Sequence, residues 1–258
     1  WDNISLIPNP VQALPLPAGP VDPDLVAYPT RGIKRKNLGE FLLLAALAPR
    51  GMKFSTTRVP EDPAQARVHA RWQAFARAAG LPVTFGAGWP DRRPARCVST
   101  SIQEGFGLAL AEPWLAGIPA TGRWLADATG LLAEAGWDPG DAYSAITVPS
   151  AWIPAGPLSR AVQRVCGKAA APAVMACHFH ADRMDFGRLP AFLQRHVLRA
   201  VIGHAVSASA IQWVLPDGSV MAAAAATASA NSTVSFSASA ARLTWWDLSI
   251  SAPSTIRK

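Results

Sequence analysis

The stretch IQEGFGLALAEPWLAG, residues 102–117, places two acidic residues around a Gly-Phe-Gly turn that leads into an apolar helix. Glycine has no Cβ, so it permits a tight turn and a close approach of the backbone to a ligand. The first N–H groups of a helix have no intrahelical partner and lie at the positive end of its dipole, which suits phosphate or sugar oxygens. We therefore predict a ligand-binding turn after Glu104, with the helix beginning near Phe106 or Gly107.

Glu104 and Glu112 are eight residues apart in this stretch, which is about two helical turns. Both carboxylates can therefore face the same crevice. A carboxylate only accepts hydrogen bonds, so the pair suits a ligand with two sets of vicinal hydroxyls, such as a sugar joined to a nucleotide ribose. A purely structural role is the alternative, in which Glu104 favours a helix N-terminus and Glu112 is solvated. The residues alone leave both interpretations open.

Strand-like and helix-like segments alternate around this turn. Buried strands are expected at 25–29, 52–58, 82–86, 96–101 and 119–123. Helices are expected at 36–48, 62–80 and 187–212, the second of them opened by an Asp62 cap and Pro63. This alternation predicts an α/β fold with a Rossmann-like parallel sheet and helices on both faces. Sheets of this kind bind ligands beyond the carboxyl ends of their strands.

Composition divides the chain into three parts. Residues 1–22 are interpreted as a strand and a proline-rich connector that lead into the domain, and 23–212 as the Rossmann-like domain. Residues 213–258 form an irregular low-complexity tail. Its Ala/Ser/Thr tract at 220–241 has too few large apolar side chains to repay the entropy of ordering. We expect this tail to be extended or only partly packed.

The overall composition is that of a globular protein, because half of the 258 residues are apolar. A net charge of +7 indicates an anionic partner, with nucleotide, nucleic acid and acidic lipid all open. Three cysteines without paired spacing favour a reducing, cytoplasmic setting, and the longest apolar run, 41–48, is too short to span a membrane. Because the chain begins at Trp1 and not at methionine, we interpret it as a processed product or a piece of a longer protein.

Three other candidate sites are weaker. CHFHAD, residues 177–182, gathers metal-binding side chains, but no second ligand pair stands at metal-site spacing, so we expect no metal. The tryptophans at 72, 114 and 124 lie in contexts that favour burial over base stacking, so we expect no nucleic-acid partner. Ser99 and Ser101 lack the nucleophile-elbow motif of hydrolases.

The E-x7-E pattern in EGFGLALAEPWLAGIPATGR resembles the C-terminal, donor-binding domain of GT-B glycosyltransferases of the family 4 type, also called glycosyl transferases group 1. ISLIPNPV resembles the segment that enters that domain, and YPTRGIKRKNLGEFLLLAAL its first strand, basic loop and helix. GIPATGRWLADATG is similar to the loop after the motif. The similarity covers about residues 4–150 and, more faintly, 187–212.

The resemblance implies a retaining enzyme that transfers a hexose from a nucleotide-diphosphate sugar to an unknown acceptor. It implies that Glu104 contacts the donor sugar and Glu112 the ribose, while the backbone at four positions faces the sugar and diphosphate: Gly105, Phe106, Gly107 and Leu108. The family's basic pair, which binds the diphosphate, matches Arg31 and Lys36. A planar guanidinium fork and a point-like ammonium are both suited to neutralising a leaving nucleoside diphosphate.

The resemblance also implies that no cofactor or metal is needed, because the basic pair and the helix N-terminus supply the electrostatic stabilisation. Arg31, Lys36 and Glu104 are then the expected catalytic residues. The family uses a separate N-terminal domain to hold the acceptor, so a missing domain or a partner chain would have to supply it. The alternative is a non-catalytic nucleotide- or anion-binding module, or a partner subunit, on the same fold. We expect a cytoplasmic location, either free or peripheral at the membrane surface.

Overall fold

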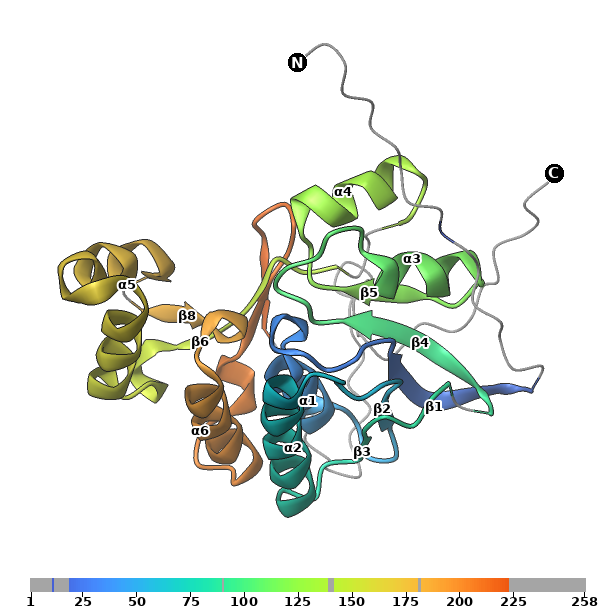
Figure 1. Ribbon diagram of the computed structural model, residues 1–258, viewed down its shortest axis with the longest axis horizontal. Coiled ribbons are helices and arrows are strands. Elements are labelled where there is room, and N and C mark those ends of the chain that lie inside the picture. Colours follow the sequence, from blue (N-terminus) through green and yellow to red (C-terminus); the bar gives the residue numbers. More distant parts are fainter. Residues whose placement is uncertain (1–10, 12–18, 90, 139–141, 181, 223–258) are drawn as a thin grey trace, which may run out of the picture.

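The computed structural model describes residues 11, 19–89, 91–138, 142–180 and 182–222, with side chains left out at 177–180. The described residues form two five-stranded sheets, one parallel and one antiparallel (Figure 1). The parallel sheet is built from the first half of the chain and the antiparallel sheet from the second. The segments 1–10, 12–18 and 223–258 lie outside the described residues, so the division of the chain at 22 and 212 stays a prediction.

The parallel sheet has the strand order β3-β2-β1-β4-β5. Its strands are β1 (Val21–Tyr28), β2 (Lys53–Thr56), β3 (Val83–Thr84), β4 (Arg93–Ser99) and β5 (Ala120–Gly122). All four strand pairs are parallel. The predicted α/β fold with a parallel sheet is thus confirmed, and each of the five expected strands is present with ends shifted by a few residues.

Four helices accompany this sheet: α1 (Leu38–Leu47), α2 (Pro63–Ala78), α3 (Leu108–Leu115) and α4 (Ala126–Glu134). The α2 helix begins as the sequence predicts, because the Asp62 side chain accepts a hydrogen bond of 2.8 Å from the Gln65 amide and Pro63 occupies the first turn. Figure 1 shows α1 and α2 on one side of the sheet, and α3 packs against β4 and β5.

Alternate residues of β1 point to opposite faces of the sheet, as strand geometry requires. Tyr28 packs on Phe41 of α1, with ring centroids 5.5 Å apart. Ala27, on the other face, packs with Cys97 and with Ile118 beyond α3. Apolar side chains therefore cover the central strand from both sides, which explains why residues 25–28 are all buried.

The antiparallel sheet has the order β10-β9-β6-β8-β7 and was not expected from the sequence. Its strands are β6 (Ala145–Pro149), β7 (Phe179–His180), β8 (Arg183–Asp185), β9 (Gln212–Val214) and β10 (Val220–Ala222). The long α5 helix (Ala155–His178), which is kinked at Gly167, connects β6 to β7. Part of the segment 213–222, which the sequence assigned to an extended or partly packed tail, pairs as β9 and β10.

The helix expected over 187–212 is shorter than the sequence indicated. It is α6 (Ala191–Ile202), preceded by a 3-10 turn at Phe186–Arg188. The helix ends at Ile202 with Gly203 as its C-cap, and the next residue, His204, has a left-handed φ of 54° that a continuing helix does not tolerate. The segment that follows turns back to place Trp213 in β9, opposite Ile146 of β6.

A buried ion pair joins the two sheets. The Arg123 guanidinium, just after β5, contacts the Glu40 carboxylate of α1 at 2.5 Å and the Asp185 carboxylate of β8 at 2.8 Å. Tyr143 donates a hydrogen bond of 2.7 Å to Glu40. Burial raises the pKa of Glu40, and Arg123 acts in the opposite direction. Burial lowers the pKa of Arg123, but the two carboxylates together raise it well above its usual value.

Amide side chains extend this network to α6. Asn37 donates to Glu40 at 3.1 Å and accepts from Gln194 of α6 at 2.8 Å. Two glycines leave the room that the network requires, because a Cβ on Gly187 would lie 2.2 Å from Arg123 and one on Gly39 would lie 2.3 Å from Gln194. The buried polar side chains of this network therefore form hydrogen bonds with one another in place of water.

Among the helices that the structure describes, none combines the length and the apolar character needed to cross a membrane.

We predict that Arg123→Met lowers the free energy of unfolding by about 3–5 kcal/mol, because it leaves the Glu40 carboxylate buried without its cation. Urea unfolding followed by circular dichroism measures the loss. Lys53→Gln is the control, since the Lys53 side chain is 60% exposed where it pairs with Asp22, and a pair with a solvent-exposed partner contributes about 1 kcal/mol or less. Equal, small losses in the two variants would contradict the role given to the buried pair.

Candidate functional site

The loops that follow β1, β2 and β4 meet at the carboxyl edge of the parallel sheet. The Arg58 amide, after β2, donates a hydrogen bond of 3.0 Å to the Thr30 carbonyl, after β1. The Ile102 amide, after β4, donates at 3.0 Å to the Arg35 carbonyl. Backbone hydrogen bonds thus join all three loops at the edge where parallel sheets bind ligands.

The basic turn, a 3-10 helix over Lys34–Lys36, is fixed by hydroxyl groups beneath it. Tyr28 and Thr100 both donate to the Lys36 carbonyl, at 3.1 and 3.0 Å, and the Tyr28 hydroxyl lies 2.7 Å from that of Ser101. Burial raises the pKa of Tyr28 well above its usual value, so its hydroxyl stays protonated and available as a donor. The strands therefore determine where the backbone of Lys36 lies.

Lys36 and Glu104 form an ion pair between the basic turn and the loop after β4. Both side chains are largely buried, with exposed fractions of 13% for Lys36 and 9% for Glu104. The sequence named both as catalytic residues, and the structure brings them together although they are far apart in the chain. Partial burial reduces screening by water, so this contact is stronger than one between exposed charges.

Arg31, the other predicted basic residue, lies exposed on the same loop. The structure records no ion pair or hydrogen bond of its side chain with any described residue. Gly32 follows it with a φ of +65°, and a Cβ there would lie 2.5 Å from a ring carbon of His69. His69 is buried, and burial lowers its pKa, so a neutral imidazole lies beneath the loop. Gly32 therefore allows the loop to pass close over α2.

The glycine turn is open toward solvent. A Cβ on Gly105 would meet no atom within 4 Å, and Phe106 and Leu108 are exposed. Gly107 has a φ of 67° and precedes α3 without any side-chain cap. The N-terminal end of α3 is therefore accessible, and its backbone amides suit an anion. The helix begins at Leu108, close to the expected position.

Glu112 lies half-buried in α3. Burial raises the pKa of its carboxyl, and the nearby positive charge of Arg58 acts in the opposite direction. Sequence reasoning did not single out Arg58 as a site residue. The available signal was its position, because it is the last residue of the strand expected at 52–58 and so lies at the same carboxyl edge as the other loops.

The described residues contain no group of three His, Cys, Asp or Glu side chains that could hold a metal ion. The side chains of the CHFHAD segment at 177–181 lie outside the described set. Cys97 and Cys166 are free thiols. The expectation of no cofactor and no metal stays a prediction.

The sequence matches no protein-family model, and no curated protein matches it. Two solved structures are similar in fold. TarM matches 76% of this chain and 33% of its own, with a TM-score of 0.41 and 14% identity. The lipopolysaccharide outer core galactosyltransferase WaaB in its apo form matches 80% of this chain and 57% of its own, with a TM-score of 0.40 and 16% identity. This chain therefore spans less than two thirds of each, and similarity at this level transfers no activity.

We predict that Gly32→Ala destabilises the protein more than Gly51→Ala does, by about 1–3 kcal/mol. Both glycines have a positive φ, but a Cβ on Gly51 would meet no atom within 4 Å, whereas one on Gly32 would collide with His69. The difference between the two variants in thermal or urea unfolding isolates that collision from backbone strain. Indistinguishable losses would show that the loop does not lie against His69.

Proposed function

We propose that this chain binds a nucleotide-diphosphate sugar at the carboxyl edge of its parallel sheet. In this proposal it is the donor-binding part of a retaining glycosyltransferase that transfers a hexose to an acceptor. The observation that carries the proposal is the Lys36–Glu104 ion pair, which lies beside the open Gly105 turn and the uncapped end of α3. The E-x7-E motif and its resemblance to the family 4 type supply the reaction class.

The ion pair places a cation and a hydrogen-bond acceptor side by side, which matches the junction between diphosphate and sugar in such a donor. The Lys36 ammonium has three donors, so it can bind a phosphate oxygen while it keeps its contact with Glu104. Glu104 then accepts a hydrogen bond from a sugar hydroxyl. As the glycosidic bond breaks, negative charge accumulates on the leaving diphosphate, and its attraction to Lys36 strengthens and lowers the barrier.

In the proposed complex, the other predicted residues surround the junction between the diphosphate and the sugar. The amides at Gly105–Leu108 face the diphosphate and sugar, and Arg31 extends from its exposed loop position to the distal phosphate. Glu112 accepts hydrogen bonds from the ribose hydroxyls in its ionised form, which the charge of Arg58 favours. The acceptor is held by a second domain or a partner chain.

A non-catalytic nucleotide-binding module is the second candidate. The described residues contain a single parallel sheet, and one such sheet is sufficient to bind a nucleotide. Slow hydrolysis of a UDP-, GDP- or ADP-sugar, or transfer by a longer piece of the same protein, distinguishes the enzyme from the module. Binding without either reaction would favour the module.

We predict that one of UDP, GDP and ADP binds in a calorimetric titration, and that Lys36→Ala weakens this binding about tenfold or more by removing a charged donor to phosphate. Lys34→Ala is the matched control, since it removes the same charge from an exposed position on the same turn. No binding of any diphosphate would reject the nucleotide site. Equal losses in both variants would show that Lys36 contributes only to the general positive field.

We predict that the affinity for the nucleoside diphosphate that binds rises as the pH increases through the pKa of Glu112, which burial places above its usual value. The protonated carboxyl is a poorer acceptor for ribose hydroxyls, so binding is weaker below that pKa and stronger above it. Titrations over a pH series with wild type and Glu112→Gln measure the effect. Ionisation of the ligand phosphate is common to both proteins, so the difference between the two profiles reports Glu112. Parallel profiles would exclude Glu112 from the site.

A further inference from the structure

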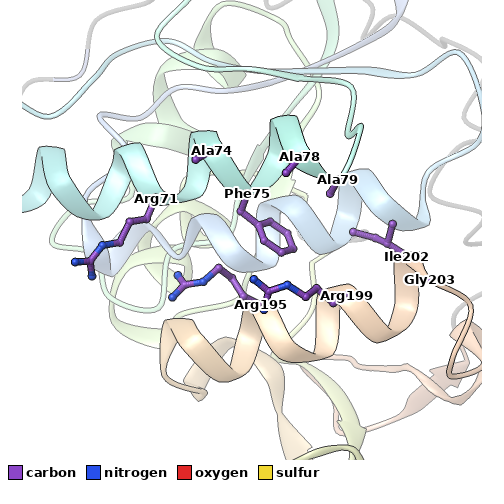
Figure 2. A pocket seen from close by; sticks show the side chains of 9 residues that line it. All are labelled: Arg71, Ala74, Phe75, Ala78, Ala79, Arg195, Arg199, Ile202 and Gly203. Atoms are coloured by element: carbon purple, nitrogen blue, oxygen red, sulfur yellow. The ribbon is translucent and has the colours of Figure 1, made fainter.

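A groove of about 580 Å³ lies between α2 and α6. Figure 2 shows Arg71 extending from α2, and Arg195 and Arg199 from α6, into the space between the two helices. The floor is apolar and includes Ala74, Phe75 and Ala78 of α2. None of the residues that line this groove belongs to the loops of the candidate donor site.

The two helices give the groove a strong positive charge. Neither the α2 sequence, PAQARVHARWQAFARA, nor the α6 sequence, AFLQRHVLRAVI, contains an aspartate or a glutamate. The structure records no ion pair between the three groove arginines and any described carboxylate. Burial lowers the pKa of Arg195, and the charges of Arg199 and Arg71 lower it further. The arginines thus repel one another, and a bound anion would relieve that repulsion.

Two of the guanidinium groups are held in position by aromatic rings. The central carbon of the Arg195 guanidinium lies 5.2 Å from the centroid of Trp72, and that of Arg199 lies 5.5 Å from the centroid of Phe75. Stacking on a ring orients a guanidinium plane and leaves its N–H edges available to a ligand. The groove is therefore organised for hydrogen bonding before any ligand arrives.

We propose that this groove is a second anion site, which binds the phosphoryl group of an organic phosphate that carries an apolar chain. The three arginines match a phosphate dianion better than a single carboxylate, and guanidinium forks bind phosphate oxygens in pairs. The apolar chain lies along Ala74, Phe75 and Ala78. The volume falls within the range of about 300–1,000 Å³ that is typical of small-molecule sites. A phospholipid head group and a free alkyl phosphate share this chemistry.

Calorimetric titration with monomeric octyl phosphate tests the site, and we expect Arg71→Gln to weaken binding about tenfold. Arg77→Gln is the matched control, because Arg77 is also an exposed arginine of α2 but does not line the groove. The double variant Arg195→Gln/Arg199→Gln should abolish binding, and thermal unfolding confirms that it is folded. No binding to wild type, or equal losses in Arg71→Gln and Arg77→Gln, would overturn the proposal.

The Lys36→Ala variant separates this site from the proposed donor site. Octyl phosphate binding should be unchanged in Lys36→Ala, and binding of the nucleoside diphosphate should be unchanged in Arg71→Gln. Loss of octyl phosphate binding in Lys36→Ala would place that ligand at the carboxyl edge and would reject the groove. Failure of UDP, GDP and ADP to bind, with octyl phosphate still bound, would reject the donor site alone.

Cosedimentation with phosphatidylcholine vesicles, with and without phosphatidic acid, distinguishes a phospholipid head group from a soluble organic phosphate as the ligand of the groove. Cosedimentation that requires both phosphatidic acid and Arg71 assigns the groove to a lipid head group. Octyl phosphate binding without vesicle binding assigns it to a soluble organic phosphate. The proposal would be contradicted if octyl phosphate does not bind and if vesicle binding persists in Arg71→Gln.

Discussion

The Glu40 carboxylate and the Arg123 guanidinium form a buried ion pair at the junction of the two sheets. A carboxylate with no exposed surface requires a cation, and Arg123 meets that need while it also binds Asp185. One guanidinium thus fixes α1, the end of β5 and the antiparallel sheet relative to one another. Asn37 extends the constraint, because it donates to Glu40 and follows Lys36 directly in the chain. The position of the candidate catalytic lysine is therefore set by a network in the protein interior.

Hydrogen bonds from the strands give the open candidate site a fixed backbone beneath it. The hydroxyls of Tyr28 and Thr100 hold the basic turn from below, while Gly105 and Arg31 above it have few contacts. Fixed charges beside an accessible backbone are suited to a phosphate-bearing ligand, because the site loses little entropy when the ligand binds. In the arginine groove between α2 and α6, aromatic rings rather than hydroxyl groups contact the positively charged side chains.

The sequence predicted the parallel sheet well because short strand-like segments alternate with helical patterns and are separated from them by glycine and proline residues. The family resemblance assigned Lys36 and Glu104 to one donor site, and the structure shows that their side chains form an ion pair. The antiparallel sheet was missed because strands such as Phe179–His180 are too short to show a period. Arg123 was missed because a buried ion pair between distant residues leaves no local pattern, and only the fold reveals that Glu40 lies within its reach.

A crystal structure of the chain with its bound nucleoside diphosphate would locate the donor site. We expect the diphosphate to lie between the Lys36 ammonium and the backbone amides at Gly105–Leu108, with the ribose hydroxyls on Glu112 and the Lys36–Glu104 contact retained. A diphosphate bound elsewhere, with Lys36 and Glu104 making only their mutual contact, would overturn the proposed site.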